Sequence, residues 1–556
     1  MNNIVDEDYF DLVIDNAIID SYPINNYGNI FRINPKFSLV TVSKEQFNMC
    51  SLGTFPYDFF PSIFTLSSEI STNSNIEKVQ SNPNFALFGQ GVLVAIIDTG
   101  IDYQHKAFQN ADGSTRIVSI WDQTVNENNN PPEGLFYGSE YNKELINLAL
   151  KNVVPLSIVP SVDEVGHGTM IAGIAGGTPD KSAQFSGVVP QCEFVIVKLK
   201  PAKKLNKQIF SIPSDKLCYE ESDVVAGLTY VTDVARKMQR PLAICIAMGT
   251  SQAGHSGIGQ TSGYLNYITN TPSIDICVSG GNEGNNRRHY LGKITQPFFN
   301  DFELNISEKD SSFSFEIWGS SPFRMGLDIT TPVGETITNL YPRISECRKL
   351  GFIITPSTIW FNNIVAESST GDQLILLRFE NALSGTWRFR ITSIDKEPIN
   401  FHAWLPTGDL ISEETYFLNS NPDITITSPG NADSPLTVSN YNGNTGNITL
   451  NSSRGYTRLG IIKPDLAAPG TDIICPMPSN KYTQITGTGA SAAHSTGIIA
   501  MVLEWAVVKG AYSSITGVII NKMLIRGAYR SPNLSYPNNV WGYGAIDIYG
   551  LFEKLI

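Results

Sequence analysis

Asp98, His167, Asn282 and Gly489 each stand where a strand ends or a helix begins, the positions from which side chains reach a shared site. Asp98 directly follows the continuous apolar run 92–97, which is typical of a parallel strand buried on both faces. An Asp at the carboxyl end of such a strand lies where open α/β sheets place their ligands. An imidazole can exchange protons and a carboxamide can donate hydrogen bonds. Gly489, by contrast, has no side chain, so it can neither attack a carbonyl group nor carry an acyl intermediate.

Four segments in this order resemble the subtilisin-like serine proteases. The run 487–497 is similar to the family signature Gly-Thr-Ser-x-Ala-x-Pro-His-x-x-Gly, with Gly489 in place of the reactive Ser. The runs 94–102 and 166–173 resemble the family segments around the catalytic Asp and His, and the run 276–284 resembles the strand end that forms the oxyanion hole. Two further matches are the runs 187–190 and 463–470.

The resemblance implies a role for each of these residues. Asp98 would orient His167 and stabilise its imidazolium, and His167 would act as the general base. Asn282 would donate a hydrogen bond to the oxyanion, an interaction whose loss usually costs about 10²–10³-fold in turnover. Because Gly489 supplies no nucleophile, we expect a degenerate triad and a pseudoenzyme without protease activity.

Two neighbouring hydroxyl groups offer an alternative nucleophile. Ser491 lies two positions further along the expected helix, which is about 200° around its axis and about 3 Å along it. That displacement exceeds the tolerance for aligned attack. Thr488 precedes the helix and is only slightly better placed. The run 245–249 also departs from the Asn-x-Ser-x-Gly strand of active relatives, which indicates relaxed constraint on the cleft. A residual or conditional endopeptidase that uses Ser491 or Thr488 is the alternative to an inert chain.

Alternating strand and helix signals surround these motifs. A helical stretch over 223–239 is followed by an apolar strand over 242–248, and this rhythm predicts a parallel α/β sheet flanked by helices. The rhythm breaks at about 290–422. There, short stretches such as 313–318 and 387–391 alternate apolar and polar residues between Gly, Pro and Asn turns, which predicts an inserted all-β domain.

A chain of 556 residues is too long for one core, so we expect several units. The predicted fold class is α/β, with a subtilisin-like parallel sheet, an N-terminal α+β prodomain and an inserted all-β jelly roll. The expected segments are a retained prodomain over 1–80, the subtilisin-like domain over 81–290 and 423–556, and the jelly-roll insertion over 291–422.

Composition excludes several classes of function. The net charge of -13 argues against a nucleic-acid-binding surface, which needs clustered Lys and Arg. Seven scattered cysteines without a Cys-x-x-Cys pair predict reduced, buried thiols. The six histidines are dispersed, so we predict neither a metal nor a cofactor. The acidic start lacks the apolar segment of a secretion signal, and we see no apolar run of the roughly 18 residues that span a membrane.

Three features together resemble one branch of the family, the Csp proteins of spore-forming clostridia. They are a leaderless prodomain-like region over 1–80, the runs 101–105 and 120–123, and a β insertion after 281–285. In that branch the insertion is a jelly roll that clamps the protease domain, and active members cut the precursor of a cortex-degrading hydrolase at germination. Catalytically dead members regulate the signal instead, and one such class is implicated in sensing bile-salt or amino-acid germinants.

The resemblance therefore implies a pseudoprotease that regulates spore germination. It is CspC-like or CspA-like, and a free-standing chain favours the CspC-like kind. The implied partners are an active Csp-type protease or other germination proteins, a small-molecule germinant, and the chain's own prodomain in the cleft. The implied location is the cortex or coat region of the spore, after synthesis inside the forespore. A mainly structural spore protein is a further alternative.

The missing nucleophile also bears on maturation. In active relatives the enzyme's own Ser cleaves the prodomain after it has helped the protease to fold. Without that Ser, the first 80 or so residues should stay covalently attached, with their tail in the cleft. Restoring the hydroxyl by Gly489→Ser should then permit some self-cleavage near residues 70–90.

Overall fold

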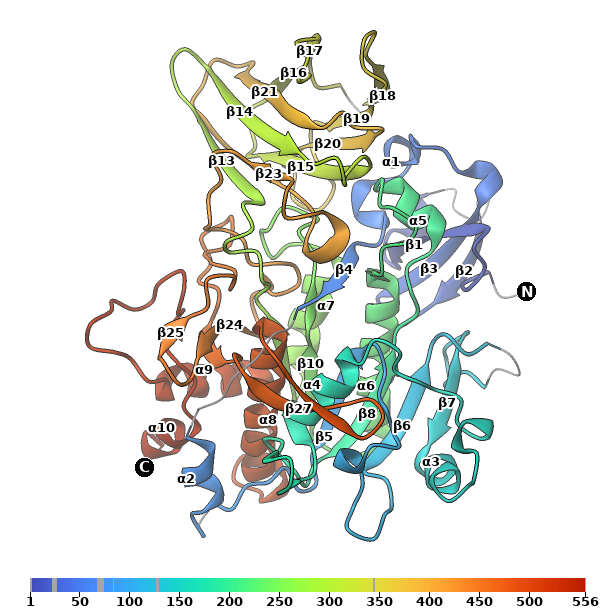
Figure 1. Cartoon of the computed structure of the whole chain (residues 1–556), viewed down its shortest axis with the longest axis vertical. Coiled ribbons are helices and arrows are strands. Elements are labelled where there is room, and N and C mark those ends of the chain that lie inside the picture. Colours follow the sequence, from blue (N-terminus) through green and yellow to red (C-terminus); the bar gives the residue numbers. More distant parts are fainter. Residues whose placement is uncertain are drawn as a thin grey trace.

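The computed structural model describes residues 3–22, 28–67, 75–83, 85–126, 130–343 and 346–555. A central sheet with helices on both faces forms the core of the molecule (Figure 1). A small N-terminal sheet lies beside it, and a pair of antiparallel sheets lies above both.

The central sheet has the strand order β25-β24-β12-β10-β5-β8-β6-β7, and β26 pairs with β24. Neighbouring strands run parallel from β24 to β6, whereas the edge strands β25 and β7 are antiparallel. The bounds are β5 (Leu93–Asp98), β6 (Ile117–Asp122), β7 (Ser139–Asn142), β8 (Glu193–Lys198), β10 (Leu242–Ile246), β12 (Ile274–Ser279), β24 (Leu436–Asn442), β25 (Asn447–Ile448) and β26 (Leu466–Pro469).

Helices cover both faces of this sheet. Those of the core are α3 (Lys143–Leu150), α4 (His167–Gly176), α5 (Lys204–Ile209), α6 (Glu221–Met238), α7 (Gln260–Thr269), α8 (Thr488–Leu503), α9 (Gly517–Gly527) and α10 (Ile548–Glu553). The short α2 (Ile76–Gln80) packs on α10, and the hairpin β27 (Ile473–Met477) and β28 (Lys481–Ile485) packs on α4.

The strand β5 shows why its sequence is apolar throughout. Successive side chains point to opposite faces of a sheet. Val94 and Ile96 therefore join the hydrophobic core that contains α4 and α8. Leu93, Ala95 and Ile97 join the core that contains α6 and α7. The structure confirms the predicted class, a parallel α/β sheet with additional all-β sheets.

The helix α8 continues through a π-helical turn, Glu504–Val508. By length and composition alone, the combined stretch Thr488–Val508 could cross a membrane, but 83% of that window is buried inside the protein. The prediction that no apolar stretch reaches about 18 residues was therefore wrong by this criterion of length and composition. Small residues such as Gly, Ala and Ser are frequent in α8, so its sequence is not strongly apolar throughout. They also let the helix pack closely against β10, β12, β24 and β26.

The N-terminal sheet has the antiparallel order β1-β3-β2, with β1 (Tyr9–Asp15), β2 (Gly28–Arg32) and β3 (Phe37–Ser43). It docks on the core beside α5 (Figure 1). Asp11 of β1 is fully buried, and its Oδ1 lies 2.6 Å from Nζ of Lys203. Asn206 of α5 accepts a hydrogen bond from the Asp11 backbone N–H at 2.9 Å. Burial raises the pKa of Asp11 to about 7, and Lys203 opposes that rise.

The antiparallel pair of sheets stands where the insertion is predicted. One sheet has the order β13-β22-β15-β20-β19-β18 and the other β17-β16-β21-β14-β23, and they share one hydrophobic core. The bounds are β13 (His289–Ile294), β14 (Phe299–Ile306), β15 (Phe313–Gly319), β16 (Met325–Thr330), β17 (Thr336–Leu340), β18 (Glu346–Gly351), β19 (Thr358–Ile364), β20 (Gln373–Glu380), β21 (Gly385–Ser393), β22 (Ile399–Trp404) and β23 (Tyr416–Phe417). The predicted strands 313–318 and 387–391 correspond to β15 and β21. Below, residues 289–417, which carry these two sheets, are called the insertion.

The prediction of seven reduced cysteines was wrong for two of them. Cys50, at the start of α1 (Ser51–Thr54), forms a disulfide with Cys347 of β18 across 297 residues of sequence. The bond ties the N-terminal region to the insertion. The other five cysteines are free and buried, as predicted. Spacing in the sequence could not reveal a pair that only the tertiary fold brings together.

Candidate functional site

Asp98 and His167 meet at the carboxyl edge of the central sheet. Asp98 ends β5, His167 begins α4, and Asp98 Oδ1 lies 2.7 Å from His167 Nδ1. Asp98 is fully buried and His167 is 5% exposed. Gly168 permits this contact, because a Cβ there would lie 2.1 Å from the carbonyl oxygen of Gly100. The carboxylate is thus placed to orient the imidazole through its Nδ1.

A second carboxylate, Asp163, holds this pair in place and was missed by the sequence analysis. Its Oδ1 accepts hydrogen bonds from the Thr99 hydroxyl at 2.7 Å and from the Gly166 N–H at 2.8 Å. Its Oδ2 accepts from the backbone N–H and hydroxyl of Thr169. Asp163 therefore links the end of β5 to the first turn of α4. An Asp four residues before the His, just ahead of the Gly-His-Gly-Thr run, is the sequence signal that could have revealed it.

Asn282 follows β12 and faces the start of α8. Its Oδ1 accepts hydrogen bonds from the Thr488 N–H and from the Thr488 hydroxyl, each at 3.1 Å. These bonds turn the carboxamide so that its NH₂ group points away from Thr488. Thr488 in turn accepts a hydrogen bond from the Gly281 N–H at 3.0 Å. Asn282 thus keeps a fixed donor, while the Thr488 hydroxyl is engaged on both sides.

Ser491 is also engaged elsewhere. Its side chain is fully buried, and its hydroxyl lies 3.1 Å from the Ala468 carbonyl oxygen and 3.3 Å from Asn440 Oδ1. Both partners belong to the strands β24 and β26, on the inner side of α8. The hydroxyl is directed toward the interior of the protein, as the predicted 200° rotation implies.

Gly489 is the second residue of α8, and a segment of the N-terminal region lies directly over it. That segment, β4 (Ile63–Leu66), forms a three-stranded sheet between β11 (Met248–Gly249) and β9 (Tyr219–Glu220). Ser67 continues it, and its N–H donates to the Ala247 carbonyl at 3.0 Å. A Cβ placed on Gly489 would lie 1.7 Å from the Ser67 carbonyl oxygen.

The residues that line the cleft match an extended peptide rather than a small molecule. Leu66 pairs with Met248 and Thr65 with Gly249, both antiparallel, which is recognition by strand addition. The departure from the usual pattern at 245–249 leaves this pairing intact, because backbone groups make it. Burial of Cys245 in the core that contains α8 raises its pKa to about 12.

A cavity of about 730 Å³ opens beside this segment. The N-terminal region, the core and the insertion all contribute residues to its lining, among them Ser67, Asn282, Arg288 and Asp409. Arg288 donates to Glu283 at 3.0 Å and to the Gly408 carbonyl at 2.9 Å, which fixes the loop of the insertion against the core.

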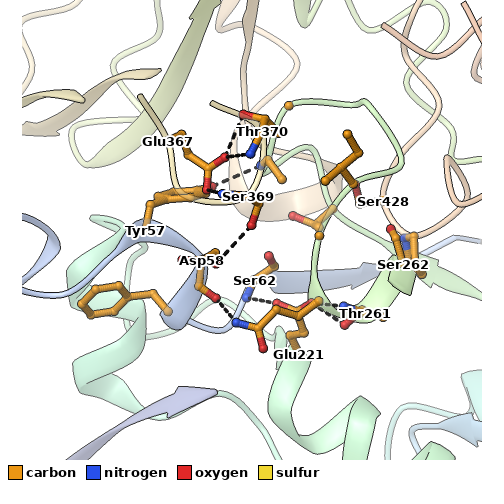
Figure 2. A pocket seen from close by; sticks show the side chains of 18 of the residues that line it. Tyr57, Asp58, Ser62, Glu221, Thr261, Ser262, Glu367, Ser369, Thr370 and Ser428 are labelled. Atoms are coloured by element: carbon orange, nitrogen blue, oxygen red, sulfur yellow. Dashed lines mark hydrogen bonds between the residues drawn. The ribbon is translucent and has the colours of Figure 1, made fainter. Parts of the chain in front are cut away.

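A smaller cavity of about 50 Å³ marks the junction of the three regions. Figure 2 shows Asp58 and Ser62 of the N-terminal region facing Glu221 of the core and Ser369 of the insertion. Glu221 accepts a hydrogen bond from the Ser62 N–H at 3.0 Å, and Asp58 accepts one from the Ser369 hydroxyl at 3.1 Å. The approach to β4 is thus fixed from both sides.

Three histidines that the sequence analysis described as dispersed meet where the insertion joins the core. His289 and His402 are 113 residues apart, yet their Nε2 and Nδ1 atoms lie 3.0 Å apart, and His255 stacks on Trp404. Burial lowers the pKa of His255 to about 4 and that of His289 to about 3, so these rings are neutral. Among the described residues, no group of three or more His, Cys, Asp or Glu side chains could hold a metal ion.

Comparisons with known proteins agree with this geometry. The model of the subtilase family matches residues 89–297 and 413–544 and leaves out most of the insertion. The structure of the Clostridium perfringens CspB protease superposes with a TM-score of 0.77 at 28% identity, and it covers 87% of this chain and 99% of that one. Thermitase of Thermoactinomyces vulgaris is 23% identical over 302 residues, which is 54% of this chain and 84% of that protein.

The C5a peptidase of Streptococcus pyogenes serotype M3 is 22% identical over 459 residues, 74% of this chain. The match spans 35% of that protein, so the chain corresponds to about a third of the length of these relatives. Because the family model covers more than half of the chain, at the segments that carry Asp98, His167, Asn282 and Gly489, the chain belongs to the subtilase family.

Proposed function

We propose that this chain is a catalytically inactive subtilase that regulates bacterial spore germination by binding. One observation carries the inactivity: residue 489, where the family has its nucleophile, is a glycine, and the Ser67 carbonyl lies over it. Asp98 and His167 have a geometry suited to activating a hydroxyl, but a glycine at residue 489 supplies none. Without a nucleophile the acyl intermediate cannot form.

The alternative endopeptidase is disfavoured by the hydrogen bonds of its two candidate nucleophiles. The Ser491 hydroxyl is buried against β24 and β26, and the Thr488 hydroxyl is held between Asn282 and Gly281. Among the described residues, neither hydroxyl has a hydrogen bond to a base that would activate it as a nucleophile.

The role in germination rests on the likeness to CspB, which extends over 99% of that chain. The likeness supports a Csp-type chain, and with Gly489 it would be a pseudoprotease, CspC-like or CspA-like, located in the spore. Its partners would be an active Csp-type protease, other germination proteins or a small-molecule germinant. Its own first 80 residues would remain attached, with residues 63–67 in the cleft.

A fluorophosphonate probe tests the inactivity, since it labels activated serines. The full chain and its Ser491→Ala variant should both remain unlabelled, beside an active subtilase as positive control. Labelling of the parent chain that disappears in Ser491→Ala would establish the residual protease instead.

Deletion of the gene in its spore-forming host tests the role. A germination defect under defined germinants, restored by the unchanged chain, supports the regulator. Normal germination with altered spore architecture would favour the structural alternative. Co-purification from spores would then identify the bound partner.

A further inference from the structure

The disulfide between Cys50 and Cys347 lies beside a buried positive charge. Arg378 of β20 is fully buried, and its Nη2 donates to the Cys347 sulfur at 3.8 Å. Its other hydrogen bonds go to the Ile209 carbonyl at 3.0 Å and to Asn362 Oδ1 at 2.7 Å. Among the described residues, none of these bonds reaches a carboxylate. A buried guanidinium without an anionic partner is costly, so a negative charge at this position would stabilise the protein.

The groups around the Cys347 sulfur are rich in hydrogen-bond donors. Asn362 stands directly opposite Cys347 on the neighbouring strand β19, and it is fully buried. In the part of the chain that the structure describes, Asn362 Nδ2 and Arg378 Nε have no hydrogen-bond acceptor. Burial lowers the pKa of Arg378 to about 9, so the guanidinium still carries its charge at neutral pH. Such donors favour an anion beside them, and the Cys347 sulfur becomes one when the disulfide is broken.

We propose that the Cys50–Cys347 bond is a thiol–disulfide exchange site, at which an external dithiol uncouples the N-terminal region from the insertion. A thiolate of the dithiol attacks the Cys50 sulfur, the S–S bond breaks, and Cys347 leaves as a thiolate beside Arg378. The second thiol then attacks the mixed disulfide and releases Cys50 and the oxidised dithiol. Two electrons pass to the protein; of the two protons of the dithiol, one goes to Cys50 and one to solvent. Both cysteines are half-buried, so the bond lies within reach of a thiol.

Cys192 shows why this partial exposure matters. Arg116 Nη2 lies 3.5 Å from the Cys192 sulfur, so an arginine stands beside this thiol as well. Cys192 is fully buried, however, and desolvation raises the pKa of its thiol to about 11 despite the opposing charge of Arg116. At the half-buried Cys347, water still reaches the residue and desolvation opposes the thiolate less. An arginine together with partial exposure therefore distinguishes the exchange site from the buried thiols.

The bond holds α1 against β18, which is the edge strand of its sheet. Other contacts between the N-terminal region and the insertion do not pass through the two sulfurs. Tyr57 donates to Glu316 at 2.5 Å, and Asp58 accepts from the Ser369 hydroxyl at 3.1 Å. Reduction should therefore free α1 and β18 while the rest of the junction holds. The thiol conditions around the protein would then set how tightly the insertion is coupled to the N-terminal region.

Redox titration of the full-length chain in dithiothreitol buffers tests the proposal, with alkylation and peptide mass mapping to quantify Cys50 and Cys347. Arg378→Met removes the buried charge. Arg388→Met is the matched control, because that guanidinium is exposed and pairs with Glu303 on the other sheet of the insertion. At half-reduction, the ratio of reduced to oxidised dithiothreitol should be about tenfold higher or more in Arg378→Met and unchanged in Arg388→Met. Equal midpoints in the unchanged chain and in Arg378→Met would overturn the proposal.

A second measurement covers the case in which Arg378→Met does not fold. In the Cys50→Ala chain, Cys347 is a free thiol beside Arg378, and its alkylation by iodoacetamide is followed against pH. The midpoint should lie about one pH unit or more below the value of about 8.5 for an ordinary cysteine, because the thiolate is the reacting form. The five buried cysteines should stay unlabelled and so report that the chain is folded. A midpoint at or above about 8.5 would contradict the proposal. Arg378→Lys, which keeps a cation, should retain the low midpoint.

Hydrogen exchange before and after reduction of the unchanged chain tests the uncoupling itself. The amides of residues 51–54 and 347–351 should exchange about tenfold faster or more in the reduced protein, since α1 and β18 lose their covalent link. The amides of the interior strand β15 should keep their rates. Equal rates at 51–54 in the two states would show that the bond couples nothing and would sink the proposal.

Discussion

The two halves of the cleft differ in how their residues are arranged. On one side, Asp98, His167 and Asn282 keep their hydrogen bonds, their burial and their orientation. On the other, residue 489 is a glycine and the Ser67 carbonyl lies directly over it. A site that had merely decayed would be loose throughout. This difference supports the proposal that the cleft is a binding site for the chain's own segment.

The largest expected loss of stability comes from breaking the ion pair between Asp11 and Lys203, which holds the N-terminal sheet on the core. Asp11→Ala removes one partner of a buried ion pair and leaves Lys203 uncompensated, so we expect a loss of about 3–5 kcal/mol in the free energy of unfolding. Asp8→Ala is the control, because Asp8 and Lys44 form an exposed pair in the same region, and water screens such a pair so that its loss should change stability little. Denaturant unfolding measures both. Equal effects of the two substitutions would show that the buried pair is not the anchor.

The disulfide between the N-terminal region and the insertion gives the next effect. Cys50→Ser should lower stability by about 2–4 kcal/mol without reductant, because the unfolded chain regains a long loop. Adding a reductant to the unchanged chain should reproduce the loss. Cys347→Ser on top of Cys50→Ser should cost little more, and a large additional loss would mean that the two residues act separately.

The stability of the protein should depend on pH through Glu316, which lies where the insertion meets the N-terminal region. This carboxyl is buried between Tyr57, Trp318 and Ala253, and desolvation raises its pKa to about 7. A folded pKa above the unfolded value near 4.5 means that its stabilising contribution is complete below about pH 4.5 and is lost as the pH rises through 7. The slope is at most about 1.4 kcal/mol per pH unit. Glu316→Gln should reduce the fall in stability between about pH 4.5 and 7, and an unchanged slope would assign that fall to other groups.

The smallest effect is expected at the hydroxyl that could have replaced the nucleophile. Ser491→Ala removes buried hydrogen bonds and should cost about 0.5–1.5 kcal/mol, with no change in any reaction toward fluorophosphonates. Thermal unfolding and probe labelling measure the two quantities on the same sample. Lost reactivity, rather than lost stability, would place chemistry at Ser491.

Local motifs made the preserved half predictable from sequence. Asp98 follows a buried strand, and Asn282 and Gly489 stand in runs of small residues whose order matches the family. The half around Gly489 was only partly predictable. Ser67 pairs with Ala247, which is 180 residues further along the chain, and no local sequence pattern marks such a long-range pair.

The peptide bond that lies over residue 489 also differs from the one expected from the sequence. The sequence analysis expected cleavage of Gly489→Ser near residues 70–90, but the carbonyl over residue 489 belongs to Ser67. The bond after Ser67 is therefore the one presented, and residues 68–74 lie outside the described residues. The disulfide and the histidine stack escaped prediction for the same reason, since long-range pairs leave no spacing pattern.

The intact mass of the purified full-length chain tests the central claim most directly. A chain whose cleft is filled by its own uncleaved segment should keep a mass of 61.0 kDa after prolonged incubation without added protease. A product that lacks the first 67 or so residues, formed spontaneously and blocked by a serine-protease inhibitor, would contradict the account.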